Sequence, residues 1–310
     1  MGRSLMYLVC GEALFDVFTE GEQGDSVPML ARPGGSPFNV AIGLTRLGHR
    51  AGLYTGLSTD VMGRRLHGLL KREDVCLDYI VDKPNRTTLV LVALDDAGVA
   101  KYSFYGDHCA DRELTLAELP TLADTVTGLH FGSYTLVAEP TASTFHALAQ
   151  REHGQRLVSL DPNVRPTIEP DMQVWRERLT SWRALADVIK VSDEDLALLY
   201  PGVAIDQIAQ DWLQAPTQVL VVTRGAEGAV GYNAQGRVEI PGIKVNVVDT
   251  VGAGDSFQAT LLSQLPDRAA LTAAATSTER LQQILSRSAQ AAAITCSRAG
   301  ANPPLAHELP

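Results

Sequence analysis

A run of small residues followed by an acid, within residues 249–259, is the segment of this chain best suited to chemistry. It contains Gly252, Ala253 and Gly254 directly before Asp255, and an apolar stretch typical of a helix follows. The unpaired N–H groups and positive dipole at the start of such a helix would attract the negative charge of a transferred phosphoryl group. Asp255 would accept the proton of an incoming hydroxyl. The alternative is a tight turn whose acid is favoured by the helix dipole alone.

A glycine pair far upstream is the second candidate segment. Gly34 and Gly35 precede a helical pattern that carries Asn39 in its first turn. Glycines let the backbone approach a ligand closely, and an amide both donates and accepts hydrogen bonds, which suits a polyhydroxylated ligand. A flexible turn before a surface asparagine is the alternative. Because a proline follows Ser36, we predict that this serine caps a helix over residues 37–47.

Strands that alternate with helix-length segments recur from residue 129 onward. The expected core strands cover residues 5–9, 129–131, 156–160, 188–191, 218–222 and 244–248, and residues 269–293 are helix-competent. This alternation predicts a mostly parallel sheet covered by helices, which binds ligands beyond the carboxyl ends of its strands. Four of these strands are followed by polar residues that we therefore expect at one site: Asp161, Ser192, Thr223 and Asp249.

A separate group of strands has no intervening helix. Residues 87–94 and 99–105 are rich in β-formers around a turn, which predicts a hairpin, and residues 15–18 alternate around Asp16. Segments of about 13–32 and 84–112 are therefore expected to form a small sheet beside the main core. A chain of 310 residues is long enough for one large domain, over residues 1–310, with such an appendage.

Composition and missing motifs exclude several function classes. The net charge is −10 without a basic cluster, which disfavours a nucleic-acid partner. The longest stretch without charged residues, 125–138, is too short to span a bilayer. The first ten residues lack an export signal, and four scattered cysteines suggest neither a disulfide framework nor a zinc site, so we expect a cytoplasmic location. P-loop, protein-kinase and dinucleotide-binding motifs are missing from the sequence.

The two glycine-rich segments together resemble the two signatures of the ribokinase-like, or PfkB, family of carbohydrate kinases. Residues 34–41 match the N-terminal signature, residues 249–255 match the C-terminal one, and residues 56–63 resemble a third element. The resemblance implies an α/β fold with a three-layer domain and a β-sheet lid. It also implies an ATP-dependent reaction with Mg²⁺, in which Asp255 is the base and residues 252–254 form the anion hole.

Within this family the chain is similar to bacterial fructokinases. The similarity rests on residues 11–16, 103–105, 110–111 and 161–165. It implies transfer of the ATP γ-phosphate to a hydroxymethyl group of a small ketose, with D-fructose giving fructose 6-phosphate. Gly106 stands where many fructokinases carry an arginine, so the sugar could instead be 2-keto-3-deoxygluconate or ribose. A catalytically silent, ligand-sensing relative is a separate alternative, against which the intact segment over residues 252–255 argues.

The resemblance also assigns binding residues. The sugar would be held by Asp16, Gly34, Gly35, Asn39, Tyr105 and Arg165. The nucleotide would contact Ser192, Thr223, Gly225, Gly228 and Gly254. Taken alone, the segment around Gly225 and Gly228 is an ordinary glycine turn, and Arg165 would be either a fork of donors for phosphate charge or an exposed ion-pairing arginine.

Two cation sites and a dimer complete these expectations. Asp195 replaces the acid of a family element that acts on magnesium through water, but Ser192 and Asp195 are also spaced as a helix N-cap and its N3 acid. Relatives suggest a monovalent cation, K⁺, near Asp249. Lids of this kind can pair edge to edge, which suggests a homodimer.

Overall fold

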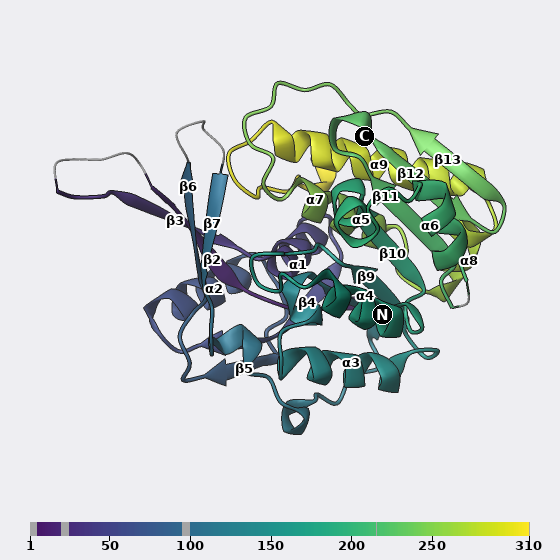
Figure 1. Ribbon diagram of the computed structural model, residues 1–310. Coiled ribbons are helices and arrows are strands. Elements are labelled where there is room, and N and C mark those ends of the chain that lie inside the picture. Colours follow the sequence, from purple (N-terminus) through teal and green to yellow (C-terminus); the bar gives the residue numbers. More distant parts are fainter. Residues whose placement is uncertain (1–4, 20–24, 95–99, 215, 310) are drawn as a thin grey trace.

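The computed structural model describes residues 5–19, 25–94, 100–214 and 216–309, in two sheets with surrounding helices (Figure 1). The large sheet runs β13 (Gly236–Ile240), β12 (Ala229–Asn233), β11 (Val219–Thr223), β10 (Val188–Ser192), β9 (Leu157–Asp161), β8 (Val126–Gly132), β1 (Met6–Cys10), β4 (Arg50–Ser58) and β5 (Ile80–Lys83). Neighbouring strands from β11 to β5 pair in parallel, and β12 and β13 are antiparallel. The predicted mostly parallel α/β sheet is confirmed.

Helices cover both faces of this sheet. One face packs against α1 (Ser36–Arg46), α2 (Val61–Arg72), α7 (Ala253–Ser263), α8 (Arg268–Ala275) and α9 (Thr278–Cys296). The other packs against α3 (Thr141–Glu152), α4 (Met172–Arg183), α5 (Asp193–Leu199) and α6 (Ile205–Trp212). Successive strand residues alternate between the faces, so Leu157 enters one core and Val158 the other. The result is the predicted three-layer arrangement.

The small sheet has the strand order β3-β2-β6-β7 and stands to one side of the main domain (Figure 1). Its strands are β2 (Leu14–Thr19), β3 (Met29–Gly34), β6 (Leu89–Leu94) and β7 (Ala100–Tyr105). Antiparallel pairing of β6 with β7 confirms the predicted hairpin, whose turn lies outside the described residues. Leu14, Val90 and Val92 pack against Tyr134 of the main domain, which fixes the sheet over it.

Two local predictions are wrong. Residues 244–248 form no strand; they belong to an irregular stretch over 241–250, and Val247 and Val248 are 60% and 59% exposed. Their alternating pattern has no neighbouring strand to pair with.

Ser36 is the first residue of α1 rather than its cap, because Gly35, at φ 107°, takes the cap position. The Ser36 N–H donates to Glu12 Oε1 at 3.2 Å, so a distant carboxylate replaces the serine side chain as the acceptor.

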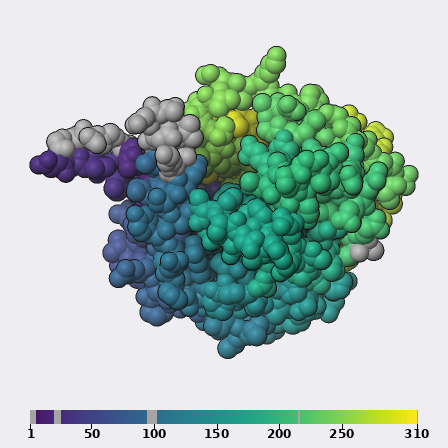
Figure 2. Space-filling view, in the orientation of Figure 1, coloured from purple at the N-terminus to yellow at the C-terminus, as the bar shows by residue number. Residues whose placement is uncertain are grey.

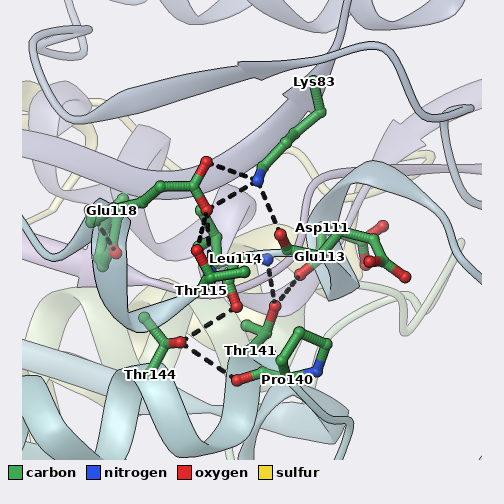
Figure 3. A network of polar contacts seen from close by, with 10 residues as sticks. Lys83, Asp111, Glu113, Leu114, Thr115, Glu118, Pro140, Thr141 and Thr144 are labelled. Atoms are coloured by element: carbon green, nitrogen blue, oxygen red, sulfur yellow. Dashed lines mark hydrogen bonds and ion pairs between the residues drawn. The ribbon is translucent and has the colours of Figure 1, made fainter.

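Hydrogen bonds fix the segment that returns from the small sheet to the main domain (Figure 3). Lys83 Nζ, at the end of β5, donates to Glu118 Oε1 at 2.6 Å and to the Glu113 carbonyl at 2.7 Å. Thr141 Oγ1 accepts from the Leu114 N–H at 3.0 Å, at the start of α3. Lys83 and Thr141 both bind the backbone of residues 113–114, so they hold the segment that follows β7 against the main domain.

The four cysteines and the lengths of the helices bear on two further features of the sequence. All four cysteines are free thiols: Cys10, Cys76, Cys109 and Cys296. Within the described ranges, every helix is too short or too polar to cross a bilayer.

Candidate active site

A cavity of about 630 Å³ lies where the small sheet faces the carboxyl ends of β9, β10 and β11. Figure 2 shows the surface hollowed between the purple and blue strands of the small sheet and the green C-terminal half. Asp161, Ser192 and Thr223, which end these three strands, line it together, as predicted. Asp249 is not among the lining residues, although Thr250 and Val251 directly after it are. Its carboxylate binds backbone N–H groups instead, so Asp249 lies beside the site and does not line it with the other three.

The glycine-rich loop lies at the cavity where α7 begins. Gly252 is the N-cap in the left-handed region, at φ 77°, and an added Cβ would lie 2.6 Å from the Ala301 Cβ. Only glycine fits this position without strain. Gly252, Gly254 and Asp255 line the cavity, whereas Ala253 is outside the lining. The first turn of this helix therefore begins at the cavity, where an anion can reach its N–H groups.

Asp255 lies in the first turn of α7 and meets the start of α1. Its Oδ2 accepts a hydrogen bond of 2.8 Å from Asn39 Nδ2. Burial raises the pKa of Asp255, while the hydrogen bond from Asn39 and the charges of Lys190 and Arg165 act in the opposite direction. The net shift is upward, which moves this carboxyl toward the pH at which a general base works best.

The residues predicted to hold a sugar lie beside Asp255. Asp16 lines the cavity from β2, and burial raises its pKa to about 6, against the charge of Arg165. An added Cβ at Gly34 would lie 2.4 Å from Asp16 Oδ2, so a glycine is required there for this carboxylate to keep its position. Gly35 lines the cavity next to it. The carboxylate of Asp16 thus lines the same cavity as the amide of Asn39 and the carboxylate of Asp255.

The last two predicted sugar residues differ in placement. Arg165 lines the cavity, and its Nη1 donates to the Val164 carbonyl at 3.0 Å. Tyr105 is 63% exposed and lies outside the lining, so the structure does not bring it to the site. Tyr102 and Phe104 of the same strand line the cavity instead, because alternate residues of a strand face opposite sides.

The predicted nucleotide residues are only partly brought together. Ser192 and Thr223 line the cavity, whereas Gly225 and Gly228 lie outside it, in the turn between β11 and β12. An added Cβ at Gly228 would lie 2.2 Å from the Ile240 carbonyl, so close packing against β13 explains this glycine without a ligand.

Ser192 and Asp195 form the helix cap that their spacing allows. The Asp195 N–H donates to Ser192 Oγ at 2.9 Å, and Asp195 Oδ1 accepts from the Val164 N–H at 2.9 Å.

Asp249 is also bound to backbone, since it accepts from the N–H groups of Val251 at 3.0 Å and Gly300 at 2.8 Å. Across the described chain, no group of three or more acidic, histidine or cysteine side chains is arranged to hold a metal ion.

Sequence reasoning missed two cavity residues, Lys190 and Glu12, whose titratable side chains are buried. Lys190 Nζ lies 2.8 Å from Asp161 Oδ2, and their side chains are 5% and 3% exposed. Glu12 is 2% exposed, and burial raises its pKa to about 8. A lysine inside the apolar run of residues 188–191 is the signal that could have identified the pair, because a buried lysine is rare without a partner.

A lidded, mostly parallel α/β sheet with a glycine loop and an acid at the start of a buried helix is the architecture of a ribokinase-like carbohydrate kinase. The sequence pattern of the pfkB family carbohydrate kinases matches residues 8–308, and the chain belongs to this family. The predicted family and fold are confirmed.

Its relatives include several fructokinases. Fructokinase of Rhizobium leguminosarum bv. trifolii is 40% identical over 264 residues, which cover 84% of this chain and 79% of the relative. Fructokinase-2 of Solanum habrochaites is 37% identical over 303 residues, covering 95% and 91%.

Solved structures agree with these relatives. Fructokinase of Xylella fastidiosa with bound ATP superposes with a TM-score of 0.87 at 28% identity, covering 98% of this chain and 95% of the other. Fructokinase of Vibrio cholerae O395 in a form with fructose, ADP and calcium has a TM-score of 0.82 at 26% identity, covering 96% and 95%.

Proposed function

We propose that this sugar kinase transfers the γ-phosphate of ATP to the 6-hydroxymethyl group of D-fructose. The observation that carries the proposal is the 2.8 Å contact between Asn39 and Asp255, which joins the two glycine-rich segments at one cavity. The fructokinase relatives, and the neighbour with fructose and ADP, support fructose as the acceptor.

In the proposed mechanism Asp255 accepts the hydroxyl proton while the sugar oxygen attacks phosphorus. The N–H groups at the start of α7, in the loop of Gly252, Ala253 and Gly254, stabilise the charge on the transferred group. Asp16 and Asn39 orient the sugar through directional hydrogen bonds. Arg165 lines the same cavity and adds a positive charge to it. The small sheet covers the sugar and excludes water, which would otherwise compete as acceptor.

The donor is ATP with a divalent cation, for which we propose Mg²⁺. Six carboxyl groups line the cavity: Glu12, Asp16, Asp161, Glu194, Asp195 and Asp255. This acidity suits a nucleotide that arrives with its metal, because Mg²⁺ keeps most of its waters and binds mainly through phosphates. Asp195 would orient one of those waters, and K⁺ would bind near Asp249 and the carbonyl groups around it. Ser192, Thr223 and Gly254 would contact the nucleotide, with Gly225 and Gly228 shaping the adjoining turn.

We further propose a homodimer formed through the small sheet. Its outer strands carry exposed apolar side chains on the face away from the cavity, with Met29 at 55% and Tyr105 at 63%. Pairing with a second copy would cover these side chains and the open strand edges. The use of ATP and the four free cysteines support a cytoplasmic location.

The test is ADP release with a panel of sugars. D-fructose is expected to give the highest kcat/KM, above 2-keto-3-deoxygluconate and ribose, with ATP and magnesium present. A higher value for another sugar would make the chain a sister kinase. No ADP release with any sugar, alongside intact nucleotide binding, would identify a ligand-sensing relative. Light scattering of the purified protein would test the dimer.

A further inference from the structure

Beneath the start of α7, three neighbouring strands place polar residues on a face that is otherwise apolar. His130 of β8, Ser159 and Asp161 of β9 and Lys190 of β10 are each at most 4% exposed. Leu157 and Val188, on the same face nearer the start of their strands, pack in the hydrophobic core. Polar groups buried at such a cost are retained only where they are paired or perform a function.

The part of this layer farther from the cavity has a structural explanation. Gln258, on the buried side of α7, donates from Nε2 to Ser159 Oγ at 2.9 Å. His130 Nδ1 lies 3.2 Å from the same Ser159 Oγ. These contacts attach α7 to the sheet and stay away from the cavity lining.

The part nearer the cavity is different because it carries charge and faces the ligand space. Lys190 and Asp161 both line the cavity, and their contact of 2.8 Å uses only one carboxylate oxygen. Asp161 Oδ1 is buried without a hydrogen-bond partner. The ion pair is therefore incompletely satisfied, as are Gln258 Oε1 and His130 Nε2 in the other part of the layer. What distinguishes the ion pair is that both of its residues line the cavity.

Lys190 also lies directly beside the glycine loop. An added Cβ at Gly254 would lie 3.7 Å from Lys190 Nζ, so no side chain separates the ammonium group from the loop. Of the residues that line the cavity, two are cationic, Lys190 and Arg165, against six acids. Lys190 thus places a positive charge beside the N–H groups that begin α7, in a cavity whose lining carries more acids than cations.

We propose that Lys190 is a catalytic residue whose ammonium group contacts the γ-phosphate at the glycine loop. This inference rests on the proposed phosphotransfer function. The bond from the sugar oxygen to phosphorus forms, the bond from phosphorus to the β–γ bridging oxygen breaks, and the hydroxyl proton passes to Asp255. Lys190 keeps its three protons throughout and neutralises charge on the transferred group. Asp161 holds the ammonium in position.

The experiment compares three variants with the parent protein. K190M removes the charge, and the D161N/K190M double variant also removes the partner, so that no unpaired buried charge is left to disturb folding. S159A is the matched control, because it changes the same buried layer away from the cavity. Circular dichroism melting checks that each variant is folded. Calorimetric titration then measures the affinity for ADP and for a non-hydrolysable ATP analogue, without any sugar.

K190M and D161N/K190M are expected to lose about 100-fold in kcat with the KM for sugar little changed. They should also lose about tenfold in affinity for the ATP analogue, but less than twofold for ADP, which lacks the γ-phosphate. S159A should stay within about threefold of the parent in kcat. A folded double variant with kcat within threefold of the parent, or an equal loss of affinity for ADP and the analogue, would overturn the proposal. If the parent protein phosphorylates no sugar, the proposed function fails. The affinities for ADP and for the ATP analogue would still show whether Lys190 contacts the γ-phosphate.

Discussion

Asn39 donates a hydrogen bond of 2.8 Å to Asp255 across 216 positions of sequence. The contact depends on close packing of α1 against α7, since an added Cβ at Gly43 would lie 2.6 Å from the Ala259 Cβ. With the two helices this near, their first turns meet at the cavity. The base that we propose and the amide that we assign to the sugar therefore belong to one hydrogen-bonded unit.

The first prediction concerns Asp255 itself. D255N removes the proton acceptor and keeps the size of the side chain, so kcat should fall about 10³-fold while the KM for sugar changes little. Steady-state ADP release measures both. D267N is the matched control, because Asp267 caps α8 by accepting from the Ala270 N–H, far from the cavity lining. It should keep kcat and stay within a few tenths of a kcal/mol of the parent in stability (~0.5 kcal/mol at most), because Asn caps a helix about as well as Asp. Near-normal turnover of D255N would refute the assignment of the base.

The second prediction is a pH effect of Asn39. Burial raises the pKa of Asp255, and the Asn39 hydrogen bond opposes that rise. Without this donor in N39L the pKa rises further, so the base is protonated up to a higher pH. The acidic limb of the kcat profile should move to higher pH, and the KM for sugar should increase. N85L is the control, since Asn85 donates to the His108 carbonyl on an exposed surface. An unchanged acidic limb in N39L would contradict the proposed coupling.

The third prediction concerns the cap of α7. G252A forces a left-handed residue to carry a Cβ that overlaps Ala301, whereas G202A adds a Cβ at a similar φ, 79°, with open space around it. Both variants should lose about 1 kcal/mol from backbone strain. Only G252A must also displace the loop, so its kcat should fall by at least about tenfold. Melting temperatures and ADP release measure the two effects. Equal behaviour of the two variants would show that the loop tolerates displacement.

The fourth prediction uses the raised pKa of Asp16, about 6. As the pH falls below this value the carboxylate gains a proton and loses acceptor capacity toward a sugar hydroxyl. The KM for sugar should therefore rise toward low pH in the parent. In D16N the KM should be about tenfold higher at neutral pH and nearly independent of pH in this range. Initial rates between pH 5 and about 8 test this, within the interval where such a carboxyl titrates. A steep pH dependence of KM in D16N would assign the effect to another group.

The fifth prediction tests the anchor of the small sheet (Figure 3). K83M removes the hydrogen bonds to Glu118 and Glu113 and should lower the free energy of unfolding by about 1–3 kcal/mol, with kcat unchanged. Burial opposes ionisation of Glu118, but hydrogen bonds from Lys83 and Thr115 hold its pKa below the usual range. This stabilisation is therefore present at neutral pH and is lost as the pH falls through the folded-state pKa.

Denaturant unfolding at neutral and acidic pH measures both effects. The difference between K83M and the parent should shrink in acid. K71M, at an exposed lysine of α2, serves as the control and should cost only a few tenths of a kcal/mol. A K83M variant as stable as the parent would show that other contacts fix the small sheet.

Local patterns in the sequence were sufficient for the framework. The apolar runs that became β9, β10 and β11 predicted a parallel sheet, because strands buried on both faces are apolar throughout. The spacing of Ser192 and Asp195 predicted the cap that opens α5. The glycines before Asp255 predicted the start of α7, because glycine is a common N-cap residue and can be recognised from the sequence around it.

Only the tertiary structure decided which partners reach each segment. Residues 244–248 had the pattern of a strand but no strand to pair with. Ser36 is not the cap of α1 because Gly35 takes that position, and the distant Glu12 carboxylate accepts from the Ser36 N–H. Tyr105 faces outward because the register of β7 turns Phe104 to the cavity. The contact of Lys190 with Asp161 forms because β9 and β10 are neighbours, which the sequence does not encode locally. Each outcome depends on packing between distant segments, and such long-range contacts leave no periodic signal in the chain.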